Sequence, residues 1–249
     1  MQVNKVFHFQ FLIVVLLVSA LACSGGGAVV PESTETPLPT STNTPKPTAT
    51  PRPTKTPNLV ATRQHEEFQS LLQTFEENGY IESTDGSIVE LDPFKESWAQ
   101  INWYQWWTLT ETDGDFVFEG HLEWTTASST PEDSGCGIVF GVQDNNDHYA
   151  VFLANSRIVF LMARGTYSYE VGKTQGSGRA NFDNPAEADF AVAAKGQSAY
   201  VSVNGDVTQY TLSADQTTEG DIGLSLLSGT NRDYGTRCEM TDMMLWRAK

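Results

Sequence analysis

The sequence has few of the residues on which metal and phosphate sites depend. Only three of its 249 residues are cysteines and four are histidines, and their spacing matches no zinc-binding motif. The full Gly-x-x-x-x-Gly-Lys-Ser/Thr phosphate-binding loop is absent, and so is the Gly-x-Ser-x-Gly nucleophile elbow. The sequence therefore gives no support to a zinc protein, a P-loop nucleotide-binding protein or an α/β-hydrolase.

Positive charge is also scarce. The chain has 15 Lys and Arg residues against 31 Asp and Glu residues, a formal net charge of −16. Only Glu32 and Glu35 of the acidic residues precede Leu59, so the acidity belongs to the rest of the chain. Such a surface repels phosphate backbones, and we expect no nucleic-acid partner. It suits cations, or it simply keeps an exported protein soluble.

The apolar run Phe9–Val18 is too short to be assigned as a membrane-spanning helix. It is followed by Ser-Ala-Leu-Ala-Cys23, which resembles the lipobox of bacterial lipoproteins but has Ala20 where a larger aliphatic residue is usual. The resemblance implies a signal peptide over residues 1–22 and a lipidated Cys23. The acyl chains would anchor the protein in the bacterial cell envelope, with its domain outside the cytoplasm. Ordinary secretion and an uncleaved anchor remain alternatives.

Residues 23–58 have the composition of a linker. Eight of the chain's 11 prolines lie between Pro31 and Pro57, separated mainly by Thr and Ser. Proline fixes φ and removes a backbone donor, so this stretch is expected to favour polyproline II and to remain unfolded. It predicts a spacer that holds the following domain away from the membrane.

Residues 59–80 predict one amphipathic helix. Phe68, Leu71, Leu72 and Phe75 follow the i, i+3, i+4, i+7 pattern, and Gly79 is a natural stop. The apolar face is expected to pack on the domain that follows.

Residues 81–249 read as short strands separated by turns. The dipeptide Asn204-Gly205 between two alternating runs is the clearest signal of a two-residue hairpin, and Asp85-Gly86 is a second such signal. Repeated short strands without intervening helices predict an all-β sandwich.

Four stretches of this region resemble a known fold family. They are GIVFGVQDNNDHYAVFLA at 137–154, AYVSVNG at 199–205, GDIGLSLLSG at 220–229 and MTDMMLW at 240–246. They resemble the concanavalin A-like lectin/glucanase jelly rolls, most closely the laminin-G-like and 3-keto-disaccharide hydrolase-like domains of bacterial surface proteins. The resemblance implies a jelly-roll β-sandwich. Because this architecture serves lectins, hydrolases and adhesion modules, it implies no single ligand.

Cys136 and Cys238 are the two cysteines that remain after the leader. An even number of cysteines in an exported domain indicates a disulfide, here from the central hairpin to the last strand. The alternative is two buried free thiols.

Glu119, His121 and Glu123 occupy alternate positions, so a strand would present all three on one face. Retaining sugar hydrolases of the resembled fold use Glu-x-Asp-x-Glu on a strand, with the outer carboxylates as nucleophile and acid/base about 5–5.5 Å apart. Here His121 stands in place of the Asp, and the outer Cα atoms would lie about 13 Å apart. The triplet is a candidate catalytic set, and a solvent-facing polar surface is the alternative.

Asp144, Asn145 and Asp147 form an oxygen-rich turn in the middle of the central hairpin. Calcium binds such oxygens, and it is the only cofactor candidate. The same residues also suit a tight turn without any metal. His148 follows the turn and is expected to be a surface residue.

Trp103, Tyr104, Trp106 and Trp107 crowd a single predicted strand. Alternation puts Trp103 and Trp107 on one face, Tyr104 and Trp106 on the other. One pair is expected in the core, and the other is a candidate platform for a sugar ring or a partner.

Together these features predict a surface-tethered, non-catalytic recognition module that binds a polysaccharide or a surface protein. A glycoside hydrolase that uses Glu119 and Glu123, and a purely structural envelope lipoprotein, are the alternatives.

Overall fold

The computed structural model describes residues 59–129, 134–154, 157–172, 175–176 and 184–249. The expected signal peptide, Cys23 and the linker over residues 23–58 therefore lie outside the described residues. The described chain holds one helix and 14 strands and belongs to one compact unit. No helix in these ranges is long and apolar enough to cross a membrane.

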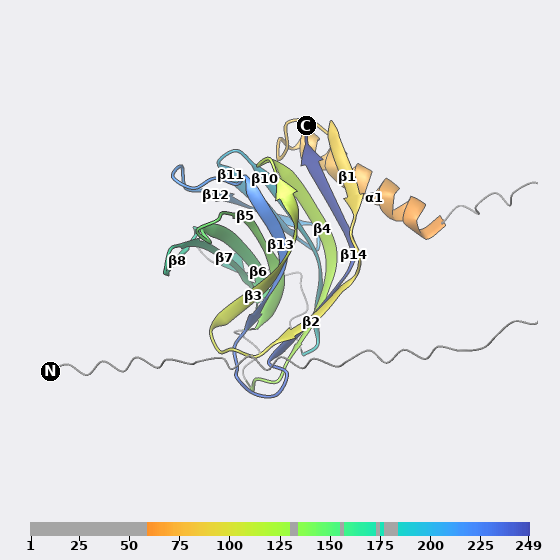
Figure 1. Ribbon diagram of the computed structural model, residues 1–249. Helices are drawn as coiled ribbons and strands as arrows, with labels where there is room; N and C mark the ends of the chain where they lie inside the picture. Colours follow the sequence, from red (N-terminus) through yellow and green to blue (C-terminus); the bar gives the residue numbers. More distant parts are fainter. Residues whose placement is uncertain (1–58, 130–133, 155–156, 173–174, 177–183) are drawn as a thin grey trace, which may run out of the picture. The chain divides into compact units, whose positions relative to one another are not determined.

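The strands form two antiparallel sheets that pack face to face (Figure 1). Sheet A has seven strands in the order β1-β14-β4-β10-β11-β12, with β2 also paired to β14. Its strands are β1 (Gly86–Glu90), β2 (Phe94–Trp98), β4 (Phe116–Thr126), β10 (Ala186–Lys195), β11 (Ser198–Val203), β12 (Asp206–Thr211) and β14 (Thr236–Ala248).

Sheet B also has seven strands, in the order β3-β13-β5-β6-β7-β8, with β9 paired to β7. Its strands are β3 (Trp103–Thr112), β5 (Gly135–Val142), β6 (His148–Ala154), β7 (Arg157–Arg164), β8 (Tyr167–Glu170), β9 (Gln175–Gly176) and β13 (Gly220–Ser228). The predicted all-β sandwich preceded by one helix is confirmed.

The main core lies between the two sheets and follows the alternation of the strands. On β4, for example, Phe116, Phe118 and Leu122 are fully buried in it. The neighbouring strands β5 and β6 are buried on both faces. That explains their nearly continuous apolar sequence, which is typical of interior strands.

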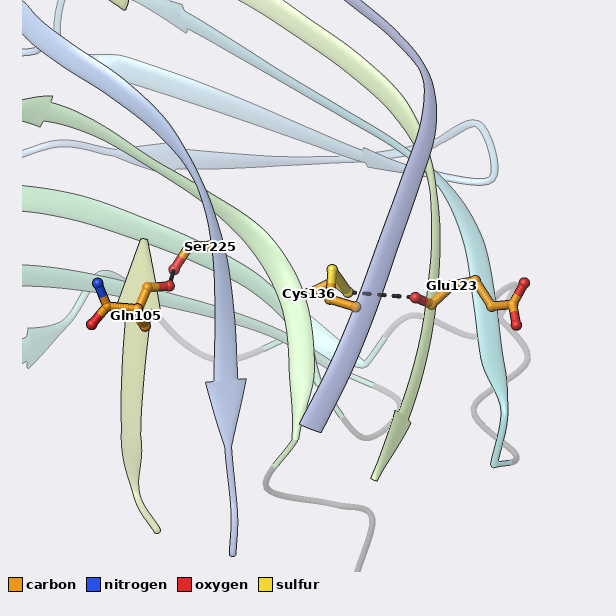
Figure 2. The surroundings of a disulfide bond; sticks show 5 residues. Gln105, Glu123, Cys136 and Ser225 are labelled. Atoms are coloured by element: carbon orange, nitrogen blue, oxygen red, sulfur yellow. Dashed lines mark hydrogen bonds between the residues drawn. A yellow bond between two sulfur atoms is a disulfide. The ribbon is translucent and has the colours of Figure 1, made fainter. Parts of the chain in front are cut away.

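A disulfide joins the two sheets through this core (Figure 2). Cys136 on β5 and Cys238 on β14 are bonded, with their Cα atoms 5.8 Å apart. The bond closes a separation of 102 residues, for which the chain-entropy model gives a stabilisation of about 4–5 kcal/mol. The disulfide predicted from the cysteine count is therefore confirmed, and the alternative of two free thiols is wrong.

Helix α1 (Leu59–Glu77) covers part of the outer face of sheet A (Figure 1). Its apolar stripe is buried, with Phe68 0%, Leu72 1% and Phe75 2% exposed. The stripe packs on the outward side chains of sheet A, among them Val117 and Trp246. This contact uses the same face that carries the polar residues of β4, so α1 bears directly on the candidate catalytic triplet.

The two hairpin signals have different outcomes. Asn204 and Gly205 do link β11 to β12, and both have positive φ (49° and 86°), as a type I′ turn requires. Asp85-Gly86 forms no hairpin, and that prediction is wrong. Gly86 instead starts β1, which pairs with the C-terminal β14. A Cβ at this position would lie 2.2 Å from Nε1 of Trp246, so the glycine is needed for close packing of the indole.

Candidate functional site

The outer face of sheet B, turned away from the main core, carries a second apolar cluster. Tyr104, Val139, Ala150 and Phe152 form it, and Trp106 packs against it. All four cluster residues are at most 9% exposed, and neighbouring side chains of the sheet, among them Val159 and Leu161, pack against them. Side chains of the sheet therefore bury one another here.

The aromatic strand β3 contributes to both faces of sheet B, but the predicted pairing of Trp103 with Trp107 is wrong, because Trp103 at the start of the strand is 55% exposed and stacks on Tyr104. Trp107 packs against the main core and meets the edge of Phe94, with ring centroids 5.2 Å apart. Tyr104 and Trp106 belong to the outer face. Next to them, Ser225 of β13 donates a 2.8 Å hydrogen bond to the backbone oxygen of Gln105 (Figure 2). This bond fixes β3 beside Trp106.

A cavity of about 660 Å³ opens beside Trp106. Its walls come from β3, from the start of β13 and from the turn between β5 and β6, so it combines two of the predicted features, the aromatic strand and the oxygen-rich turn. The lining is Trp106, Thr108, Glu111, Val142, Gln143, Asp144, Asn145, Asn146, Gly220 and Asp221. Trp106, Asp144 and Asn145 are thus brought together, whereas Trp103 and Trp107 are not part of this lining.

Glu111 and Asp221 add negative charge that the sequence did not single out. They are direct partners in the β3–β13 ladder. Like charges opposite each other destabilise a pair of strands, so the pairing of Glu111 with Asp221 does not stabilise the sheet. The partnership joins residues far apart in the sequence, and no local pattern could have found it.

The turn Gln143–Asp147 is held by its own side chains. Asp147 accepts a 3.1 Å hydrogen bond from the amide of Asn145 and a 2.7 Å hydrogen bond from the backbone nitrogen of Gly165. Asn146 has a positive φ of 63°, which asparagine tolerates in turns. The Asp147 carboxylate is thus engaged in turn geometry, and within the described ranges no three His, Cys, Asp or Glu residues are grouped as metal ligands.

His148 ties this turn to the aromatic strand. Its Nδ1 lies 2.6 Å from the backbone oxygen of Asn146, and its Nε2 lies 2.6 Å from the hydroxyl oxygen of Tyr104. A carbonyl only accepts, so Nδ1 donates and Nε2 accepts from the Tyr104 hydroxyl. Burial raises the pKa of Tyr104 to about 12 and lowers the pKa of His148.

The expectation that His148 is a surface residue is wrong, because the side chain is only 3% exposed. It shares the outer face of β6 with Ala150 and Phe152, which are fully buried. The alternation of His148 with Ala150 and Phe152 was the sequence signal that indicated a buried position for His148. The turn next to it obscured that signal.

The triplet of β4 lies on the other sheet. Glu119, His121 and Glu123 share the outer face of sheet A, as alternation predicts, with α1 packed on the same face. Glu119 lines a cavity of about 480 Å³ next to α1, together with Glu67 and Asp189. Burial first, and then the charges of Asp189 and Glu67, raise the pKa of Glu119 to about 7.

His121 lines the same cavity as Glu119, whereas Glu123 does not. Nδ1 of His121 lies 2.8 Å from a carboxylate oxygen of Asp189. Glu123 lines a different cavity, of about 200 Å³, with Lys95 and Arg237, and its carboxylate points away from the core (Figure 2). The structure therefore does not bring Glu119 and Glu123 into one cavity, nor either of them to the tryptophans of β3.

Comparisons with known proteins add little to this geometry. No protein-family model matches the chain, and no curated protein matches it. Among solved structures, the carbohydrate-binding module CBM66 from Bacillus subtilis is 10% identical with a TM-score of 0.45, over 66% of this chain and 92% of that one.

Two further structures show the same level of similarity. A fructosyltransferase from A. japonicus is 14% identical with a TM-score of 0.48, over 66% of this chain and 26% of its own. The β-glucanase of Bacillus licheniformis is 12% identical with a TM-score of 0.41, over 55% of this chain and 68% of its own. At such identities the similarity concerns the arrangement of strands and not the ligand.

Proposed function

We propose that this chain is a surface-tethered, non-catalytic recognition module that binds carbohydrate on the outer face of sheet B. The observation that carries the proposal is the half-buried ring of Trp106 in the wall of a polar cavity of about 660 Å³. A sugar ring has apolar C–H faces and a rim of hydroxyls. An indole suits the faces, and the carboxylates and amides around it suit the rim.

The charge of the cavity narrows the class of carbohydrate. Glu111, Asp144 and Asp221 are among its lining residues, and no Lys or Arg of the described chain lines it. Carboxylates accept hydrogen bonds from hydroxyl groups but repel uronate and sulfate groups. Neutral polysaccharides are therefore the expected ligands, in preference to polyanionic ones.

The test is a binding panel with residues 54–249, which make up one compact unit. Neutral glucans, xylan, mannan and fructan are compared with alginate and polygalacturonate, each with and without calcium. Trp106→Ala should weaken binding of a neutral polysaccharide at least tenfold. The matched control Tyr167→Ala removes an aromatic ring that is 68% exposed on β8 and should change nothing. Absence of binding to every polysaccharide would overturn the proposal.

The surface tether is also a proposal, since it depends on residues 1–58, which lie outside the described residues. Small residues before Cys23 and a proline-rich stretch after it support a lipid anchor followed by a spacer. In a bacterial host, full-length protein should partition into detergent and Cys23→Ser protein should not. Equal partitioning of the two would contradict the anchor and leave carbohydrate binding untouched.

A further inference from the structure

Three aromatic side chains of β3 form a continuous row. The rings of Trp103 and Tyr104 are stacked, with centroids 6.1 Å apart and an interplanar angle of 18°. The rings of Tyr104 and Trp106 follow at 6.0 Å. Tyr104 is therefore the link between two tryptophans, and the row extends the platform of Trp106 out of its cavity.

Solvent reaches this row mainly at its two ends. Trp103 is 55% exposed and Tyr104 only 9% exposed, while Trp106 is half-buried in the cavity wall. Ile101, close to Trp103 in sequence, is 51% exposed. Exposure of a tryptophan and an isoleucine together is unfavourable for a soluble domain and is typical of a binding surface.

The middle of the row is held in place. The Tyr104 hydroxyl is bound to His148, which is bound in turn to the turn carbonyl of Asn146. The Tyr104 ring also contacts Phe152, with centroids 5.2 Å apart. A ligand that covers the row therefore meets rings that are already ordered, so little conformational entropy is lost on binding.

We propose that the site binds an internal stretch of a linear polysaccharide along β3, with one sugar on Trp106 and another on Trp103. This inference rests on the proposed carbohydrate binding and adds the form of the ligand. A single pyranose ring is about as wide as a single aromatic ring, so one terminal sugar in the cavity leaves Trp103 bare. A chain of several sugars covers both exposed rings and leaves the cavity at the Trp103 end.

The experiment measures affinity against chain length. Laminari-, cello-, xylo-, manno- and fructo-oligosaccharides of one to six units are titrated into residues 54–249 and their variants by calorimetry. Affinity in at least one series should rise about tenfold or more with length and then level off, since each stacked aromatic contributes at the scale of a tenfold change.

The variants separate the two ends of the row. Trp103→Ala should abolish the gain from chain length while leaving the monosaccharide affinity within about twofold. Trp106→Ala should weaken every length, and Tyr167→Ala none. An unchanged melting temperature of the Trp103→Ala protein shows that its exposed ring is not needed for folding.

Two outcomes overturn the inference while carbohydrate binding stands. One is equal affinity for the monosaccharide and the hexasaccharide of the series that binds. The other is a Trp103→Ala variant that binds the hexasaccharide as tightly as the unmodified chain. Absence of binding in all five series overturns the inference and the proposed function together.

Discussion

The hydroxyl of Tyr104 donates to Nε2 of His148 across two intervening strands. Tyr104 lies on β3 and His148 on β6, with β13 and β5 between them in the sheet. Their rings also meet edge to face, with centroids 5.7 Å apart. This contact joins the aromatic strand to the polar turn, the two features that form the proposed carbohydrate site.

Removal of that hydroxyl is expected to destabilise the domain. Tyr104→Phe keeps the ring but leaves the buried Nε2 of His148 without its donor, at a cost of about 1–3 kcal/mol. Tyr210→Phe is the matched control, because the Tyr210 hydroxyl is buried without a hydrogen-bond partner in the described chain. Urea unfolding of both variants gives the comparison. An equal loss of stability in the two would contradict the importance of the Tyr104–His148 bond.

Neutralisation of Asp221 should separate stability from binding. Asp221→Asn removes the like-charge pairing with Glu111 across β3 and β13, so the free energy of unfolding should rise by about 0.2–1 kcal/mol. If the carboxylate accepts a hydroxyl of the sugar, polysaccharide affinity should fall several-fold in the same variant. A loss of both stability and affinity would indicate a structural role instead.

The stability of the domain should depend on Glu119 between about pH 4.5 and 7. Its pKa is raised from 4.5 to about 7 in the folded chain, so the folded state holds the proton more tightly than the unfolded state. Below this window both states are protonated and there is no effect. As the pH rises through it, ionisation of the half-buried carboxylate progressively destabilises the folded state.

Glu119→Gln is therefore expected to leave stability nearly unchanged at pH 4 and to increase it at pH 8. After allowance for solvent screening, the increase should be roughly 1–2 kcal/mol. Glu123→Gln, on the same strand but exposed, is the control. Chemical unfolding at both pH values measures the difference. A stabilisation by Glu119→Gln that is equal at both values would rule out ionisation as its cause.

The absence of catalysis is a prediction in its own right. Incubation of the chain with any polysaccharide that it binds should release no reducing ends, because Glu119 and Glu123 line different cavities. Any hydrolysis by the chain would make the non-catalytic proposal wrong, and its loss in Glu119→Gln or Glu123→Gln would assign it to that carboxylate. Hydrolysis that survives both variants would place the catalytic groups elsewhere in the chain.

Loss of the disulfide should be the largest single destabilisation. The Cys136→Ala, Cys238→Ala double variant is expected to lose about 2–5 kcal/mol. The intact mass of the unmodified protein should rise by two hydrogens on reduction in denaturant. Because Cys136 belongs to the core between the sheets and Trp106 to the outer face of sheet B, a variant that still folds should bind polysaccharide with unchanged affinity.

Local patterns predicted much of this fold. Alternation assigned the two faces of β4 correctly, and Asn204-Gly205 supplied the positive φ angles that a two-residue hairpin needs. The cysteine count predicted the disulfide between the sheets. The first two predictions depend on conformational preferences that act over a few residues, and the third depends on the chemistry of a cysteine pair.

The contacts of the candidate site could not be predicted from local patterns. The partnership of Glu111 with Asp221 and the contact of Tyr104 with His148 both join strands distant in the sequence, and the pairing of β3 with β13 has no local signal. The failure at Asp85-Gly86 has the same origin, because the partner of β1 is the last strand of the chain. Turn preference depends on a few neighbouring residues, whereas the partner of a strand is determined by the packing of the whole sheet.

The position of α1 at the start of the folded chain has a mechanical consequence. A cell-surface protein held at its N-terminus and attached to a large polymer is stretched by flowing liquid. If this chain is tethered as proposed, a pull from the N-terminal side would reach the described residues at Leu59 and act first on the side-chain contacts of α1, among them those of Phe68 and Leu72. The sheets behind it are joined covalently by Cys136 and Cys238. If the proposed tether and polymer binding hold, we expect α1, which is attached only by side-chain contacts, to detach under load before the disulfide-joined sheets separate.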